Sequence, residues 1–310
     1  MVSPTLPIIK TATRLSFHPT ELRDIADVRP LLAHSPYRTC DFSVGGIFMW
    51  SDYFRYSHCI VDNTLFIRGM SEDDITRPAF SLPVGGMPLS ESIPMLLDYC
   101  ADHGMPLELS AVPEEALDEL RRLGATEITE LTDWSDYLYE APRMATFAGK
   151  KLSKKRNHVN HFHAEFPDAI VTPLTPDVMK DVMHFYQAQS VGADKPLTAD
   201  YERLQVLEVL NKAEVFGFEG CAVIIPGRGV VAFTMGEVIG DTLYSHIEKM
   251  DHNVAGAGEM VSSAFTSLML ERHPDLQYVN REEDTGDLGL RQAKLAYQPL
   301  RLLRKYNVSF

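Results

Sequence analysis

The sequence predicts a mixed α/β (α+β) protein with two lobes, each containing a mostly antiparallel sheet flanked by helices. The chain has 310 residues, which exceeds the length at which a single hydrophobic core usually stops growing, so two domains of about 150 residues each are expected. Helix, hairpin and strand signals in the first half are followed by a similar series in the second half. We therefore expect an N-terminal lobe over residues 1–145 and a C-terminal lobe over residues 146–310.

The first half shows signals for a capped helix, a hairpin, a helix, a strand, a second helix and a strand. These signals cover residues 19–28, 48–68, 92–103, 107–110, 113–123 and 134–139. Thr20 is placed to cap the first helix, because a threonine hydroxyl can accept a hydrogen bond from the backbone amides that follow it. Asp62 and Asn63 favour the tight turn of the hairpin, and a glycine ends each of the two later helices.

A basic segment over residues 150–163 opens the second half and is predicted to be helical. Three strands then form an antiparallel meander, because short apolar and β-branched runs alternate with glycine-containing turns. A glycine-containing loop, a helix, a strand, a helix and a last strand complete the series. The predicted helices cover residues 175–189, 201–210, 259–272 and 288–296, and the predicted strands cover 220–225, 230–239, 242–249, 277–280 and 300–308.

Composition disfavours several classes of protein. The net charge of −14 argues against binding DNA over the whole surface, because such binding depends on Lys and Arg neutralising phosphates. Every apolar run is shorter than the roughly 20 residues needed to span a bilayer, and the first residues show no secretory signal, so a cytoplasmic protein is expected. Reduced thiols are expected rather than disulfides or a zinc site, because the cysteines are scattered and form no C-x-x-C pair. They are Cys40, Cys59, Cys100 and Cys221.

The loop of residues 252–258 lies between a predicted strand and a predicted helix. Free backbone amides and the helix dipole at such a position favour an anionic phosphate or carboxylate, which makes Gly256 and Gly258 candidate donor-binding residues. The loop matches neither the dinucleotide-binding fingerprint nor a P-loop, because its glycine spacing differs and no Lys-Ser/Thr pair follows. A plain turn that needs glycine for its backbone geometry is the alternative.

Two segments carry a resemblance to a known family. Residues 137–162 read YLYEAPRMATFAGKKLSKKRNHVNHF, and residues 278–306 read YVNREEDTGDLGLRQAKLAYQPLRLLRKY. Together with the order of the predicted elements, they resemble the bacterial family related to the C-terminal domain of phosphatidylglycerol lysyltransferase. The resemblance covers most of the chain and implies a tandem pair of acetyltransferase-like lobes.

The resemblance also implies a reaction. Relatives take an aminoacyl group from charged tRNA and give it to a lipid headgroup, and other members of the wider fold take acetyl from coenzyme A. We therefore expect an acyl- or aminoacyl-group transferase with aminoacyl-tRNA or acyl-CoA as co-substrate and no tightly bound cofactor. The expected acceptor is a small-molecule amine or hydroxyl or a lipid headgroup, and the acceptor end of a tRNA is an expected partner. A non-catalytic module that senses an anionic or nucleotide-containing ligand is the alternative, because a duplicated fold can keep a pocket without its chemistry.

The basic segment contrasts with an otherwise acidic chain, which predicts an anion-facing surface. Its candidate donor-binding residues are Lys154, Lys155, Arg156, Asn157 and Asn160. The lysines and the arginine attract an anion, and the amide side chains can orient it. A solvated helix face between the lobes is the alternative. The histidines of this segment lack a ligand set for zinc, and no metal site is predicted.

The acidic segment of residues 280–297 is predicted to carry the chemistry, because loops that follow strand ends often hold catalytic groups. Glu282, Glu283 or Asp284 could deprotonate the acceptor, and Tyr297 could protonate the leaving group. Candidate donor-binding residues are Asn280, Arg281, Arg291 and Lys294, which could bind donor phosphates or stabilise an oxyanion. Ion pairs of the three carboxylates with Arg291 and Lys294, capping the next helix, are the alternative.

His246 and Glu248 are predicted to line the cleft. They alternate on the strand before the glycine-containing loop, so both side chains should point to the same sheet face. A buried, hydrogen-bonded pair is the alternative.

Overall fold

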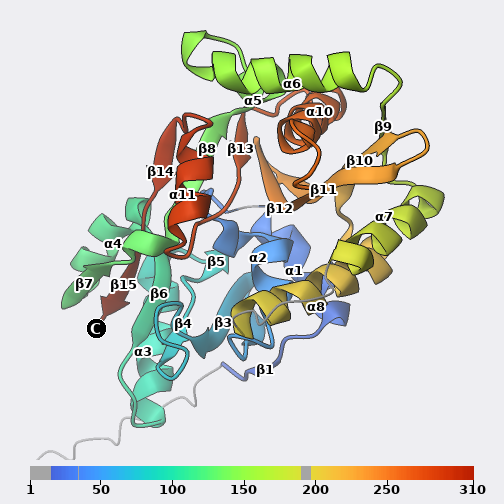
Figure 1. Cartoon of the computed structure of the whole chain (residues 1–310). Helices are drawn as coiled ribbons and strands as arrows, with labels where there is room; N and C mark the ends of the chain where they lie inside the picture. Colours follow the sequence, from blue (N-terminus) through green and yellow to red (C-terminus); the bar gives the residue numbers. More distant parts are fainter. Residues whose placement is uncertain (1–14, 34, 190–196) are drawn as a thin grey trace, which may run out of the picture.

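Two sheets form the framework of the chain in the computed structural model, which describes residues 15–33, 35–189 and 197–310 (Figure 1). The first sheet has the strand order β1-β2-β3-β4-β6-β15-β7, with β5 also paired to β3, and the second has the order β14-β8-β13-β12-β11-β10-β9. Most strand pairs are antiparallel; β4 pairs with β6 and β12 pairs with β13 in parallel. The expected fold class, two mixed and mostly antiparallel sheets flanked by helices, is confirmed.

The elements of the first half are β1 (His18–Pro19), η1 (Leu22–Asp24), α1 (Ile25–Leu32), η2 (Cys40–Phe42), α2 (Val44–Phe48), β2 (Ser57–Val61), β3 (Thr64–Met70), β4 (Pro78–Phe80), β5 (Val84–Gly85), α3 (Leu89–Asp102), β6 (Glu108–Pro113), η3 (Glu114–Ala116), α4 (Leu117–Arg122), β7 (Glu127–Glu130), η4 (Thr132–Trp134), β8 (Asp136–Glu140) and α5 (Ala141–Thr146). Those of the second half are η5 (Lys150–Leu152), α6 (Ser153–Glu165), β9 (Ile170–Pro173), α7 (Pro176–Gln189), α8 (Leu197–Asn211), α9 (Ala213–Phe216), β10 (Glu219–Ile225), β11 (Gly229–Ile239), β12 (Thr242–Met250), α10 (Ala257–Arg272), β13 (Tyr278–Asn280), α11 (Leu288–Leu295), β14 (Arg301–Leu303) and β15 (Lys305–Ser309).

The two sheets exchange strands. Strand β8 comes from the first half of the chain and pairs with β13 and β14 of the second sheet, whereas β15 is the last strand and lies between β6 and β7 of the first sheet (Figure 1). The single strand expected over residues 300–308 is therefore wrong: the chain breaks at Arg304, and its two parts join different sheets. Sheet membership does not follow the expected boundary at residue 145, which falls within α5, and two lobes as separate folding units stay a prediction.

Two hydrophobic clusters hold the sheets and helices together. One joins the first sheet, α1, α2 and α3 to α7 and to one face of the second sheet, where Phe233, Met235 and Ile247 lie. The other fills the opposite face of the second sheet, beneath α5, α6 and α10, with Phe162 and Phe265 among its fully buried residues. The first cluster thus gives the two halves of the chain a shared core. The basic helix α6 packs on α10, on the face of the second sheet that the second cluster covers (Figure 1).

Local expectations for the first half are met except at its first helix. The turn at Asp62 and Asn63 is confirmed, and both residues have the left-handed backbone conformation of a tight hairpin turn. The expected cap at Thr20 is wrong. The helical segment begins later, with Glu21 before it, and the Glu21 amide donates to the Asp24 carboxylate, while the Thr20 hydroxyl bonds His58 instead.

All four cysteines are buried and unpaired, as expected. Within the described ranges, each helix is either too short or too polar to cross a bilayer. The first 14 residues, where no secretory signal was expected, lie outside those ranges.

Candidate active site

Strands β12 and β13 of the second sheet pair in parallel over a short stretch and then separate. Their pairing runs from Thr242 to Tyr244 on β12 and from Tyr278 to Asn280 on β13, after which β12 continues alone beside β11. The loop of residues 281–287 leaves the end of β13, and helix α10 begins nearby after the glycine-containing loop. This arrangement of meander, loop, helix and parallel strand is the expected acetyltransferase-like layout.

Close packing surrounds both glycines of the predicted phosphate loop. Gly256 precedes α10 with φ +82°, and an added Cβ there would lie 2.6 Å from the His158 carbonyl oxygen of α6. A Cβ on Gly258 would lie 2.6 Å from the Met250 sulfur. Both glycines therefore let α10 approach its neighbours, which agrees with the alternative of a turn that needs glycine for its backbone geometry. That Gly256 and Gly258 bind the donor stays a prediction.

Arg281 is the centre of the first polar cluster at the opened pair. Its guanidinium bonds Glu248 of β12 at 2.7 Å and lies over the Tyr297 ring, 4.4 Å from the centroid. From α6, the Lys155 ammonium lies 3.8 Å from the same centroid and pairs with Glu259 of α10. The structure thus brings together residues that the sequence placed in two separate segments.

One nitrogen of Arg281 has no hydrogen-bond partner. Nη1 is buried and has no hydrogen-bond partner in the part of the chain that the structure describes. The pKa of Arg281 is nevertheless raised above its usual value, because the nearby charge of Glu248 outweighs the effect of burial. Arg281 packs with Ser245, Ser262 and Thr266 where β12, β13 and α10 meet, around a hollow too small to hold a water molecule. A buried cationic donor without an acceptor is costly, so the guanidinium is poised for an anionic or carbonyl oxygen.

The candidate donor-binding residues of α6 point in different directions. Lys154, Asn157 and Asn160 are exposed, whereas Lys155 turns towards Tyr297 and Arg156 donates to the Phe147 carbonyl at 2.7 Å. The exposed three recur every third residue, so they lie on the solvent side of the helix.

A second polar cluster lies where the strands are exchanged. Lys305 of β15 is fully buried, and its ammonium lies 2.9 Å from Asp136, 3.0 Å from Asp41 and 3.5 Å from Glu283. The Cys40 thiol donates to Glu283 at 3.3 Å. The side chain of Glu283 keeps 17% of its surface exposed, whereas that of Asp136 keeps none, so Glu283 is the more accessible of these two carboxylates.

The pKa values in this cluster follow from burial and from Lys305. Burial raises the pKa of Asp136 to about 7, although Lys305 opposes the shift. For Glu283 burial also favours the neutral form, but Lys305 and Lys294 outweigh it and hold its pKa below the usual value. Burial raises the pKa of the Cys40 thiol well above its usual value, so Cys40 is a neutral donor and not a nucleophile.

His246 joins the loop after β13 to the N-terminal half. Its two ring nitrogens bond Glu282 at 2.7 Å and Glu237 at 3.0 Å, and Glu237 in turn accepts from the Gly45 amide of α2. The expectation that His246 and Glu248 share a sheet face is wrong. A β-bulge at His246, where Ser245 pairs with Gly236 and Ile247 with Met235, turns His246 towards α2 while Glu248 faces α10.

The other predicted residues of the acidic segment hold the loop in place. Asp284 is buried and accepts from Tyr137 at 2.5 Å and from Arg291 at 2.6 and 2.9 Å. The Lys294 ammonium donates to the carbonyl oxygens of residues 281, 282 and 283, around Glu282 in its left-handed conformation at φ 57°. Asn280 is fully buried and bonds Asp136. Asp284 and Arg291 therefore form an ion pair, which is the alternative stated for this segment. The cap of α11 comes from Asp287 and not from one of the three predicted carboxylates.

Sequence reasoning missed several residues of these clusters, namely Cys40, Asp41, Asp136, Glu237, Glu259 and Lys305. Each has a partner far away in the chain, so no local pattern marks it. Lys305 follows Arg304 directly in the sequence, so its charge gave no sign that it is buried, although a buried lysine needs carboxylates around it.

The two strand-exchanged sheets, with a polar site at an opened parallel pair, define a protein of the tandem acetyltransferase-like class. The family model described as phosphatidylglycerol lysyltransferase, C-terminal, matches residues 33–309. The chain belongs to this family, as the resemblance predicted.

Solved structures agree with this assignment. A conserved protein of unknown function from Bacteroides thetaiotaomicron is 28% identical, with a TM-score of 0.84 over 96% of this chain and 99% of that one. L-PGS from Bacillus licheniformis (12% identity, TM-score 0.63, 92% and 91% of the chains) and FemX (8%, 0.57, 96% and 98%) share the fold. An uncharacterized protein from Mycoplasmoides gallisepticum is 22% identical over 175 residues, so the match spans about half, 56%, of that relative's length.

Proposed function

We propose that this chain transfers an aminoacyl group from an aminoacyl-tRNA to an amine or hydroxyl acceptor. Membership of the phosphatidylglycerol lysyltransferase C-terminal family supports aminoacyl transfer as the class of reaction, and the folds of L-PGS and FemX agree with it. The observation that carries the proposal is the buried, unpartnered Nη1 of Arg281 at the opening of β12 and β13. That nitrogen can donate to the carbonyl oxygen on which charge develops when an ester is attacked.

The exposed face of α6 supports a polyanionic donor. Lys154 supplies a charge on this face, and Asn157 and Asn160 supply amide groups beside it. Lys155 continues the positive charge inward to Tyr297 and Arg281. A tRNA acceptor end could lie along this face with its terminal ribose towards Arg281, because phosphate contacts position a nucleic acid while other groups act on its end.

The chemistry requires one proton transfer in each direction. The acceptor nitrogen or oxygen attacks the ester carbonyl carbon, a new C–N or C–O bond forms, and the bond from that carbon to the ribose oxygen breaks. Glu283 takes the proton that the acceptor loses, since an attacking amine becomes acidic once it carries positive charge. Tyr297 gives a proton to the ribose oxygen; burial raises its pKa, so it stays protonated at neutral pH.

A binding module without turnover is the second candidate, favoured by the internal bonds of Asp284, Arg291 and Lys294. These groups have their hydrogen-bonding capacity largely filled by the protein. They can support a ligand site without taking part in a reaction.

The experiment measures transfer of label from aminoacyl-tRNA to a panel of amines, alcohols and phosphatidylglycerol vesicles, with labelled acetyl-coenzyme A as a parallel donor. Arg281→Lys keeps the charge beside Glu248 but loses the planar donor fork, and we expect its rate to fall about 100- to 1,000-fold. Glu283→Gln should lower the rate as well. Arg121→Lys is the matched control, because Arg121 forms only an exposed pair with Asp118, and it should keep the wild-type rate.

Ligand-induced thermal shift with each donor is measured on the same samples. Stabilisation by tRNA or coenzyme A without product from any acceptor would support the binding module and contradict the transferase. Transfer from acetyl-coenzyme A alone would contradict the donor that we propose.

A further inference from the structure

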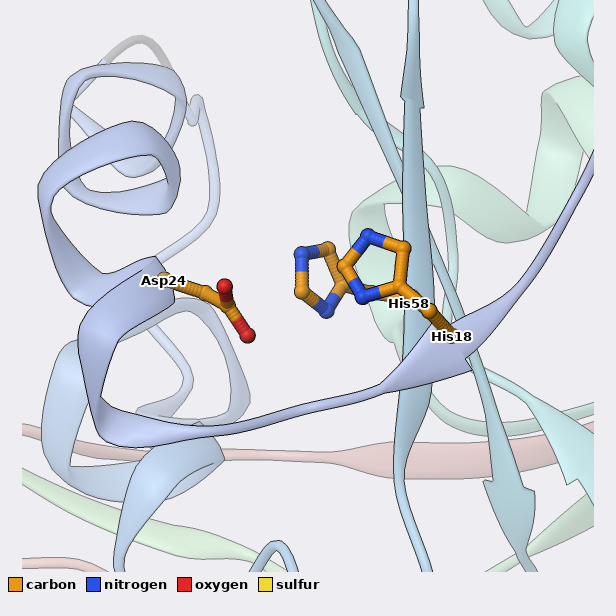
Figure 2. Close-up of side chains that lie close together, drawn as sticks. All are labelled: His18, Asp24 and His58. Carbon is orange, nitrogen blue, oxygen red and sulfur yellow. The ribbon is translucent and has the colours of Figure 1, made fainter.

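A histidine pair lies at the edge of the first sheet, away from the clusters described above. His18 of β1 and His58 of β2 face each other directly in the antiparallel register, and their rings make an edge contact at 4.3 Å between centroids. Asp24 of η1 extends its carboxylate towards the two rings (Figure 2). One ring nitrogen from each histidine and one Asp24 oxygen all lie within 4.8 Å of one another.

We propose that His18, Asp24 and His58 form a binding site for a divalent transition-metal ion of the zinc class. Two imidazoles and one carboxylate are a common ligand set for such ions, and three protein ligands leave a position for water. In a tetrahedral site with bonds of about 2.1 Å, ligand atoms lie roughly 3.4 Å apart, so the three atoms have to approach one another by up to about 1.4 Å when an ion binds.

The surroundings of His58 match those of a metal ligand. The Thr20 hydroxyl lies 3.0 Å from its Nδ1, and a ligating histidine usually bonds an oxygen through the nitrogen that does not face the ion. The other nitrogen is then available to the ion. The Glu21 amide fixes Asp24 by donating to its Oδ2 at 2.8 Å, which leaves Oδ1 for the ion.

Accessibility also fits. His58 is buried, with 3% of its surface exposed, whereas His18 is exposed. An ion can therefore enter from the His18 side and keep a water there, while two of its ligands come from the rigid strand β2 and the capped turn η1.

A second group of comparable spacing, Cys40, Asp136 and Glu283, does not compete among the residues that the structure describes. The Lys305 ammonium lies 2.9 Å from Asp136 and already supplies the cation for that group. At the histidine site Arg23 lies beside Asp24, with its Nε 3.9 Å from Asp24 Oδ1 and its side chain 77% exposed, so it does not fill the site.

The test is a titration of the full chain, without a polyhistidine tag, with ZnCl2 in an isothermal calorimeter, after dialysis against a chelator. We expect one Zn²⁺ per chain and a higher melting temperature with the ion. His18→Gln and His58→Gln should each weaken binding at least about 100-fold, since removing an outer-shell partner alone costs about 10- to 100-fold. Thr20→Val, which removes only that partner of His58, should fall within the 10- to 100-fold range.

Two further variants separate the site from folding and from unrelated histidines. Asp24→Asn keeps an oxygen that can accept from the Glu21 amide, but loses the charge and should weaken binding without changing the circular dichroism spectrum. His103→Gln removes an exposed histidine whose ring bonds the Tyr99 carbonyl, and binding should stay unchanged. No heat of binding to the wild type at micromolar zinc, or an equal loss in His103→Gln, would overturn the proposal, and so would undiminished binding by a folded Asp24→Asn variant.

Discussion

A clear pH dependence of stability is expected at His246. Burial alone lowers the pKa of its imidazole, but the hydrogen bonds to Glu237 and Glu282 outweigh burial and raise the pKa from 6.5 to about 9. A group whose pKa is raised by folding stabilises the native state fully below the unfolded pKa and loses this contribution as pH rises through the folded one. A rise from 6.5 to about 9 corresponds to about 3 kcal/mol of stability, present near pH 6 and lost near pH 9.5.

Urea unfolding of the wild type and of His246→Gln at these two pH values measures the effect. We expect the wild type to lose about 3 kcal/mol more than the variant between pH 6 and pH 9.5. His103→Gln is the matched control and should show the wild-type loss, because His103 bonds a carbonyl oxygen and not a carboxylate. Equal losses in the wild type and in His246→Gln would refute the bridged imidazolium.

Three further predictions concern packing, the buried lysine and the proposed acid. Gly45→Ala places a Cβ 2.4 Å from the His246 ring and should cost about 1–3 kcal/mol in urea unfolding; Gly86→Ala, whose added Cβ meets its nearest atom at 3.5 Å, is the control, and an equal effect of both would contradict the steric argument. Lys305→Met leaves buried carboxylates without their cation and should cost about 3–5 kcal/mol at pH 7; a variant as stable as the wild type would show that the cluster is neutral. Tyr297→Phe keeps the ring but not the hydroxyl, so the melting temperature should stay nearly unchanged while the transfer rate falls about 100-fold or more; an unchanged rate would remove Tyr297 from the chemistry.

Local pattern was sufficient for most of the fold. The meander of β10, β11 and β12 was predicted to within a residue or two at nearly every end, because alternating apolar residues and glycine turns are signals that neighbouring residues carry. The exchange of β8 and β15 has no local signal. Residues 300–308 were predicted as one strand, and only the positions of two separate sheets determine that the chain breaks at Arg304.

The family resemblance and the polar loop after a predicted strand indicated the candidate site, but they could not assign roles to its residues. All of residues 280–284 are polar, so the sequence does not tell which of Arg281, Glu283 and Asp284 the protein leaves free to act on a ligand. A charged side chain can act on a ligand only if the protein leaves some of its hydrogen-bonding capacity unfilled. Asp284 has its oxygens bonded to Tyr137, Arg291 and the backbone, whereas Arg281 retains a free nitrogen.

The hydrogen-bond partners of these side chains come from distant parts of the sequence. In this chain the exchanged strands β8 and β15 bring several of them to the site. Lys305 reaches Glu283 because β15 returns to the first sheet, and Asp136 lies beside them because β8 crosses to the second. If the exchange builds the site, Lys305 and Asp136 should show coupling between their substitutions in a double-mutant cycle, both in unfolding free energy and in transfer rate. Additive effects in both measurements would mean that the exchanged strands stabilise the fold without shaping Glu283, and the assignment of Glu283 as the proton acceptor would lose its structural basis.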